Sequence, residues 1–128
     1  MTAPGASERP LVLLVDDEES MLKVLERRLQ SWGCHVLLAA NGPEALRLAQ
    51  ERRPNLILLD VMMPEMDGLE VCRRLRAAQH TRQIPVVLVT VKSTQLSAQE
   101  IRSSGAVQVV GKPYDPRELE ETVRAALK

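Results

Sequence analysis

Residues 56–68 read LILLDVMMPEMDG, and this stretch decides the fold. Four apolar residues end at a carboxylate, Asp60, and a short loop then closes on Asp67 and Gly68. A buried strand commonly ends at a turn residue such as Asp, so an ordinary strand end explains Asp60 as well as a reactive or metal-binding carboxylate does. The rest of the chain must distinguish between these two interpretations.

The sequence contains five short apolar runs, at residues 11–15, 36–39, 56–59, 86–89 and 107–110. Most are continuous rather than alternating, which is typical of strands covered on both faces. Helical patterns separate them, over residues 19–32, from 41–43 to before Pro54, after Gly68, over 95–103 and over 116–127. We therefore expect an α/β fold, a doubly wound five-stranded parallel sheet in the flavodoxin-like order 2-1-3-4-5 with five helices.

The pattern of residues 95–103 is the weakest of the five, because Leu96 and Ile101 are its only apolar anchors. We expect this helix to be the mobile element.

Length and composition limit the class of protein. The 128 residues suit one domain, which we place at 10–128 after a flexible tail of residues 1–9. Lysine plus arginine and aspartate plus glutamate both number 17, and aromatic residues make up only 2%, so neither bulk charge nor base stacking favours nucleic-acid binding. No apolar stretch approaches the length of a membrane span, and we expect a cytoplasmic protein. Cys34 and Cys72 are interpreted as free thiols, with a disulfide left open.

Polar side chains follow four of the five apolar runs. Asp16 and Asp17 follow the first, Asp60 the third, Thr90 the fourth, and Lys112 lies just beyond the fifth. Each has an ordinary explanation, such as helix capping, strand preference or a solvated charge. In a parallel sheet, however, the carboxyl ends of the strands meet at one edge, where ligands bind.

Three carboxylates at that edge would repel one another unless a cation lies among them, and Mg²⁺ prefers such oxygen ligands. Lys112 is able to pair with a carboxylate or a phosphoryl oxygen, and Thr90 is able to donate a hydrogen bond to the same group. The set predicts a phosphoryl-transfer site with Asp60 as the nucleophile.

From about Leu11 to Leu127, the sequence resembles the receiver domains of two-component response regulators. The resemblance rests on Asp16-Asp17, on the D-x-x-M-P-x-M-D-G run of residues 60–68, on Thr90 and on Lys112-Pro113. It implies that a histidine kinase or a histidine phosphotransfer protein phosphorylates Asp60. It also implies Mg²⁺ bound by Asp17, Asp60 and the backbone carbonyl of Met62, with Asp16 acting through water, and a cis Lys112-Pro113 peptide bond.

Four positions depart from the usual receiver pattern. Val109 stands where receivers usually carry a switch aromatic, so we expect output to depend on Thr90, the loop after it and the helix at 95–103. Val91 stands where Ala or Gly is usual and should slow phosphorylation by crowding the approach to Asp60. Neither Met62 nor Lys92 resembles a residue that orients water, and for Met62 we predict a long-lived phosphoryl-aspartate.

Other classes fit less well. Flavodoxin-like flavin binding would need a Ser/Thr/Gly-rich phosphate loop where DDEES stands, and a phosphatase of the haloacid dehalogenase type would need Asp where Met62 stands. A receiver-fold interaction module that signals without phosphorylation stays open because of Val91 and Val109.

Output is expected through a protein surface. We place it on the fourth helix, the fifth strand and the last helix, near Tyr114, with a downstream effector protein as partner rather than DNA. A homodimer through the same surface, and membership of a longer regulator, both stay open.

Overall fold

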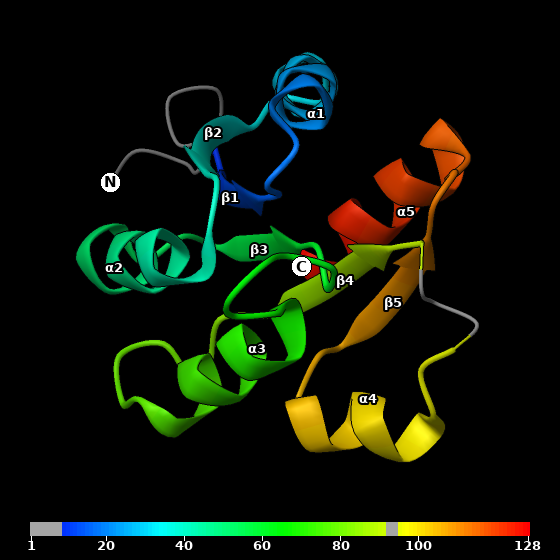
Figure 1. The fold of residues 1–128 in the computed structure, drawn as a ribbon. Coiled ribbons are helices and arrows are strands. Elements are labelled where there is room, and N and C mark those ends of the chain that lie inside the picture. The colour runs from blue at the N-terminus through cyan, green and yellow to red at the C-terminus, as the bar shows by residue number, and fades with distance from the viewer. Residues whose placement is uncertain (1–8, 92–94) are drawn as a thin grey trace.

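The structure, a computed structural model, describes residues 9–91 and 95–128. Strands and helices alternate along the chain (Figure 1). The strands are β1 (Leu11–Val15), β2 (His35–Ala39), β3 (Leu56–Leu59), β4 (Val86–Thr90) and β5 (Gln108–Gly111). The helices are α1 (Glu19–Ser31), α2 (Gly42–Arg52), α3 (Gly68–Ala77), α4 (Ala98–Ser104) and α5 (Pro116–Ala126).

The sheet is parallel throughout and has the order β2-β1-β3-β4-β5, which confirms the predicted doubly wound α/β fold. Helices α1 and α5 cover one face, and α2, α3 and α4 cover the other (Figure 1). The chain leaves β1 for α1 on one face of the sheet and leaves β3 for α3 on the opposite face, so the strand order reverses between β1 and β3. The crevice at this reversal lies beyond the carboxyl ends of β1 and β3, where doubly wound sheets place their ligand sites.

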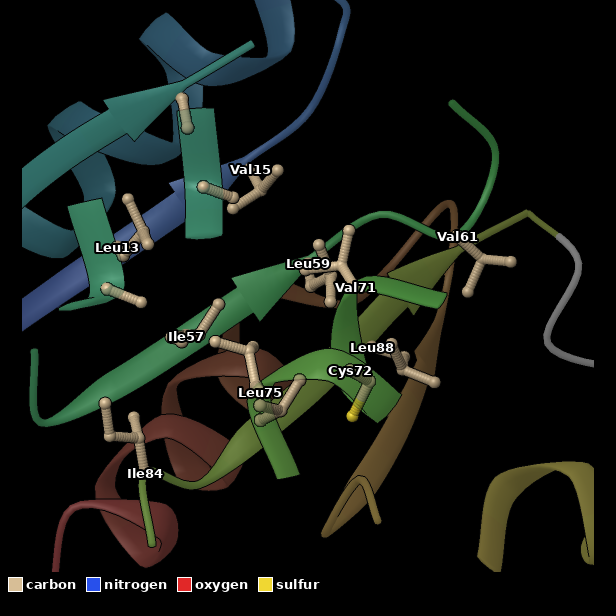
Figure 2. Packing of buried hydrophobic residues seen from close by; sticks show 14 of the residues in the cluster. Leu13, Val15, Ile57, Leu59, Val61, Val71, Cys72, Leu75, Ile84 and Leu88 are labelled. Carbon is tan, nitrogen blue, oxygen red and sulfur yellow. The ribbon is translucent and has the colours of Figure 1, made fainter. Parts of the chain in front are cut away.

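The central strands are continuous apolar runs because both of their faces are buried. In β3, Ile57 and Leu59 point into the core beneath α2 and α3, which Figure 2 shows, while Leu56 and Leu58 point into the core beneath α1 and α5. All four side chains are at most 2% exposed. Each fully buried leucine contributes about 2 kcal/mol to folding, so the sheet is a rigid base for the residues at its carboxyl edge.

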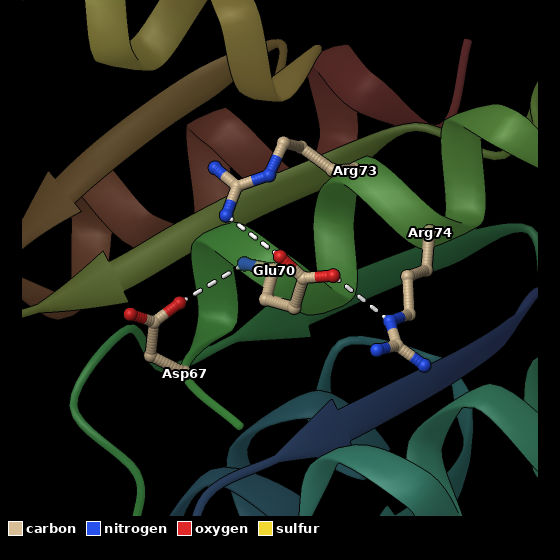
Figure 3. Close-up of polar contacts among 4 residues, drawn as sticks. All are labelled: Asp67, Glu70, Arg73 and Arg74. Atoms are coloured by element: carbon tan, nitrogen blue, oxygen red, sulfur yellow. Dashed lines mark hydrogen bonds and ion pairs between the residues drawn. The ribbon is translucent and has the colours of Figure 1, made fainter. Parts of the chain in front are cut away.

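Side-chain caps set the starts of four helices. The side chains of Asn41, Asp67, Ser97 and Asp115 each accept a hydrogen bond from a backbone N–H in the first turn of the helix that follows. Figure 3 shows the cap of α3, where Asp67 accepts from the Glu70 N–H and the Glu70 side chain pairs with Arg73 and Arg74. These two arginines lower the pKa of the Glu70 carboxyl through their hydrogen bonds, and the hydrogen bond from Arg74 has the larger effect.

The fourth helix begins later than the predicted residue 95. It runs over Ala98–Ser104 because Ser97 and Glu100 form a reciprocal capping box at its start, and Gly105, with φ +82°, ends it. The mobility expected for this helix stays a prediction. The expected tail of residues 1–9 lies outside the described residues except for Arg9.

Candidate functional site

Four strand ends bring the predicted site residues to one edge of the sheet. Asp16 directly follows β1, Asp60 directly follows β3, Thr90 ends β4 and Lys112 directly follows β5. Strands β1 and β3 are neighbours in the sheet, and Val15 lies opposite Leu59 in their register. Asp16 and Asp60, the residues that follow this pair, are therefore next to each other across the two strands.

The three predicted carboxylates form one cluster. Asp16, Asp17 and Asp60 each offer an oxygen, and these oxygens lie within 4.8 Å of one another. Asp16 is 3% exposed and Asp60 is 7% exposed, whereas Asp17 is exposed. In the described part of the chain, this is the one group of three or more acidic, histidine or cysteine side chains that could hold a metal ion.

A role in starting the next helix does not by itself explain the position of the Asp16 carboxylate. Its Oδ1 accepts a hydrogen bond from the backbone N–H of Glu18 at 2.9 Å, which helps to turn the chain toward α1. Its other oxygen, Oδ2, lies 2.8 Å from the Lys112 Nζ. The carboxylate therefore serves both the local turn and the cluster at the strand ends.

Lys112 supplies the counter-charge. Its ammonium lies 2.8 Å from Asp16 Oδ2 and 3.8 Å from Asp60 Oδ2, and its side chain is only 13% exposed. The Lys112-Pro113 peptide bond is cis, as expected from the resemblance. One lysine faces three carboxylates, so the cluster carries a formal excess of negative charge that a divalent cation would offset.

Burial raises the pKa of the Asp60 carboxyl above its ordinary value. The ammonium of Lys112 opposes this rise, while the negative charges of Asp16 and, less strongly, Asp17 add to it. The ionised form of Asp60 is therefore disfavoured in the protein alone, and a cation beside it would favour ionisation. An all-oxygen donor set with this charge imbalance fits Mg²⁺.

The loop after Asp60 is held against the end of β3. A Cβ atom on Gly68 would lie 2.2 Å from the carbonyl oxygen of Asp60, so only glycine permits the close approach. Gly68 also donates its N–H to the Val61 carbonyl at 2.9 Å, and the Met62 N–H donates to Asp60 Oδ1 at 3.2 Å. The start of α3 thus fixes the backbone around Asp60.

Thr90 is the last residue of β4, and Val91 directly follows it. Thr90 is fully buried, and its carbonyl accepts a hydrogen bond from the Lys112 N–H at 3.0 Å. Val91 is 59% exposed and Met62 is 44% exposed, and both line the cleft. Lys92 lies outside the described residues. The complete lining consists of Asp16, Asp17, Glu18, Met21, Asp60, Met62, Val91, Lys112 and Pro113.

Sequence reasoning did not single out Glu18 and Met21 as cleft residues. Glu18 directly follows Asp17, so adjacency could have marked it. Met21 lies in the first turn of α1, and its position at the cleft depends on how α1 packs.

Val109 packs with the core beneath α2 and α3, opposite Leu88 in the register of β4 and β5. The side chains of a strand alternate between its faces, so Thr90, two residues after Leu88, is directed to the same face as Val109. Val109, at the position where receivers usually carry an aromatic residue, is therefore on the face of the sheet that α2, α3 and α4 cover.

The remaining candidate ligands are dispersed. Cys34 and Cys72 are free and buried, as predicted, and burial raises the pKa of both thiols. His80 lies 3.1 Å from a guanidinium nitrogen of Arg53, and His35 is exposed at the start of β2. None of the helices that the structure describes is long and apolar enough to cross a membrane.

The fold and the site define a response regulator receiver domain. The chain belongs to this family, whose pattern matches residues 12–124. Receiver domains are switches in phosphorylation-dependent two-component signalling, and they bind Mg²⁺ at an acidic site.

Among curated relatives, the transcriptional regulatory protein PhoP of Bacillus subtilis is 39% identical over 117 residues, which cover 91% of this chain and 48% of PhoP. AfsQ1 of Streptomyces coelicolor is 40% identical over 119 residues, which cover 93% of this chain and 52% of AfsQ1. The chain thus spans about half the length of these regulators.

Among solved structures, the Vibrio cholerae chemotaxis protein CheY4 superposes with a TM-score of 0.87 and 34% identity, covering 93% of this chain and 99% of that one. The receiver domain of the sensor histidine kinase PA1611 from Pseudomonas aeruginosa superposes with a TM-score of 0.85 and 29% identity, covering 93% and 98%. The PA1611 structure has a magnesium ion coordinated in its active-site cleft.

Proposed function

We propose that Asp60 accepts a phosphoryl group from a histidine kinase or a histidine phosphotransfer protein. A single observation carries the proposal: a nearly buried carboxylate lies at the strand-order reversal with two further carboxylates and one lysine ammonium beside it. An Asp60 oxygen attacks phosphorus, an O–P bond forms, and the P–N bond to the donor histidine breaks. The donor nitrogen keeps the bonding electron pair, and the group leaves as a neutral imidazole from the form of the phosphohistidine whose other ring nitrogen carries a proton.

The other residues of the site balance charge around this transfer. Asp17, Asp60 and the Met62 carbonyl would hold Mg²⁺, with Asp16 acting through water, and the ion supplies positive charge next to the transferring group. Lys112, now paired with Asp16, is close enough to Asp60 to contact a phosphoryl oxygen there. Thr90 ends the neighbouring strand and would donate its hydroxyl hydrogen to another phosphoryl oxygen.

The proposed output surface consists of α4, β5 and α5. Strand β5 is at the edge of the sheet, so its outer side has no neighbouring strand in the described structure. A downstream effector protein would bind there after phosphorylation, and a homodimer through the same surface is the alternative. The chain would act either by itself or as the receiver of a longer regulator. Its cytoplasmic location and its domain limits at 10–128 stay predictions.

The test uses acetyl phosphate as the phosphoryl donor in the presence of Mg²⁺, with intact protein mass as the readout. The protein should gain the mass of one phosphoryl group, and Asp60→Asn should gain none. Omission of Mg²⁺ or addition of a chelator should suppress the gain. A phosphoryl group on the Asp60→Asn variant would refute Asp60 as the acceptor. No mass gain on the unmodified protein would favour a module that signals without phosphorylation.

A further inference from the structure

Helix α4 is attached to the rest of the protein mainly at its C-terminal end. Its principal neighbour is α3, which lies beside it on the same face of the sheet (Figure 1). Ser104, the last residue of α4, is fully buried. Residues 98–100, its first turn, are all exposed. The two ends of this short helix therefore differ in how firmly they are held.

The side chain of Arg76 on α3 binds the C-terminal end of α4. Its Nε donates to the carbonyl of Gly105, the residue that ends α4, at 3.2 Å. The two terminal nitrogens of the same guanidinium donate to the carbonyls of Arg82 and Ile84, the latter at 2.5 Å. One charged side chain thus joins the end of α4 to the segment that leads into β4, through hydrogen bonds of the strong, charge-assisted kind.

Packing around Arg76 reinforces this attachment. Gly105 has a φ of +82°, and a Cβ atom there would lie 2.7 Å from the Arg76 Cγ, so the backbone of Gly105 lies directly against the arginine stem. The Ser104 hydroxyl donates to the Ile101 carbonyl at 2.6 Å and accepts from the Ala106 N–H at 3.2 Å.

The N-terminal end of α4 makes its hydrogen bonds within itself. The Ser97 hydroxyl accepts from the Glu100 N–H at 2.9 Å, and the Glu100 carboxylate accepts from the Ser97 N–H at 3.0 Å. Within the described part of the chain, no hydrogen bond or ion pair joins residues 95–100 to another element. Leu96, which is half-buried against the core, is the apolar contact at this end.

We propose that Arg76 makes the C-terminal end of α4 a fixed pivot, about which the N-terminal end swings when the site at Asp60 is phosphorylated. The inference rests on the proposed function for its trigger and on the Arg76 contacts for its geometry. With Val109 in place of an aromatic side chain, the moving part is the helix itself. Arg76 is a positioning residue, because it lies away from the reacting atoms.

A pivot at Gly105 predicts unequal displacements along α4. At about 1.5 Å per residue, position 99 lies roughly 9 Å from Gly105 and position 103 roughly 3 Å from it, so position 99 should move about three times as far. Spin labels on Gln99→Cys or Ser103→Cys, each paired with a label on Gln50→Cys of α2, report these movements as two distances. All three positions are exposed, and the native cysteines are buried.

The first arm of the experiment uses the unphosphorylated protein. The distribution of distances to position 99 should be clearly broader than the distribution to position 103. Arg76→Met, which keeps the aliphatic stem but removes the donors, should broaden the second distribution to match the first. Arg73→Met is the matched control on α3, because among the described residues the Arg73 guanidinium binds Glu70 alone (Figure 3).

Equal widths at the two positions in the unmodified protein would overturn the pivot, as would an equal effect of the two arginine variants. If Arg76→Met does not fold, Arg76→Gln retains part of the donor set and should give an intermediate broadening. Unchanged widths in that variant would also count against the proposal.

The second arm adds Mg²⁺ and beryllofluoride, which imitates a phosphoryl group on aspartate. The mean distance to position 99 should shift about three times as far as the distance to position 103. Equal shifts would mean that α4 translates as a body and would refute the pivot. If beryllofluoride fails to bind and acetyl phosphate fails to modify Asp60, the proposed function fails, while the widths of the first arm still decide the pivot.

Discussion

Replacing Asp60 by asparagine should stabilise the metal-free protein at neutral pH. The Asp60 carboxylate lies 3.8 Å from the Lys112 ammonium, an attraction of about 4 kcal/mol at an effective dielectric constant of about 20. It lies within 4.8 Å of oxygens on Asp16 and Asp17, and each of these contacts repels it by about 3 kcal/mol at the same dielectric constant. Repulsion therefore exceeds attraction, before the cost of burying the charge is added.

The expected gain in the free energy of unfolding is about 1 to 2 kcal/mol, because the exposure of Asp17 weakens its part of the repulsion. The Oδ1 of asparagine is still able to accept the Met62 N–H, and Lys112 keeps its 2.8 Å contact with Asp16. For a chain of this size the gain corresponds to a melting temperature higher by roughly 4 to 8 °C. Urea or thermal unfolding in a chelator, followed by circular dichroism, measures it.

The stability advantage of Asp60→Asn over the unmodified protein should depend on pH in a defined direction. The pKa of Asp60 is higher in the folded protein than its ordinary value of 3.8, so the folded state binds this proton more tightly than the unfolded chain does. Its contribution to stability is fully present below the unfolded pKa and is lost as the pH rises through the folded pKa. The advantage of Asp60→Asn should therefore be small in acid and should grow toward neutral pH.

Mg²⁺ should act in the opposite direction. At ten times its dissociation constant, it should stabilise the unmodified protein by about 1.4 kcal/mol and the variant by less. Asp67→Asn is the control, since it removes one charge nearby while asparagine caps a helix as well as aspartate does. If Asp60→Asn is no more stable than the unmodified protein at pH 7 without metal, or if its advantage does not grow with pH, the description of the charge cluster is wrong.

Three further variants address the rest of the site. Gly68→Ala should lose more than about 2 kcal/mol of stability and weaken Mg²⁺ binding, because its Cβ would lie 2.2 Å from the Asp60 carbonyl; unfolding and metal titration measure both effects. Val91→Ala should be phosphorylated faster by acetyl phosphate, and equal rates would refute the crowding expected from Val91. Met62→Asn should shorten the lifetime of the phosphoryl group severalfold, because an amide is able to orient water and a thioether is not; prompt loss from the unmodified protein in Mg²⁺ would contradict this.

The fold was predictable because its signals are local. A strand buried on both faces must be apolar at every position, and LILL at 56–59 and VVLVT at 86–90 meet that condition without knowledge of their neighbours. The grouping of Asp16, Asp60 and Lys112 was predictable for a related reason, since parallel strands deliver their carboxyl ends to one edge whatever their spacing in the sequence.

The attachment of α4 was not predictable in this way. Arg76 has the spacing of an ordinary solvated residue on the outer side of α3, and the carbonyls that it binds belong to segments six to twenty-nine residues further along. The start of α4 was misplaced because the apolar Leu96 was assigned to the helix, whereas Ser97 and Glu100 form the cap after it. Both features depend on packing or on a competition between local hydrogen bonds, which apolar periodicity does not record.

The two sides of the cleft differ in what they allow to move. The backbone of Asp60 is fixed because it directly follows β3 and because Gly68 packs against its carbonyl group. The proposed phosphoryl group would therefore be attached to a rigid base. Thr90 and Lys112 are joined through the hydrogen bond from the Lys112 N–H to the Thr90 carbonyl, so a phosphoryl group that draws on both would act on the ends of β4 and β5 together. The chain that leaves β4 leads to the loosely held end of α4, while Arg76 holds the other end. Under the proposed pivot, a displacement at Thr90 would therefore move the first turn of α4, whose residues 98–100 are all exposed, rather than the end of α4 at Gly105.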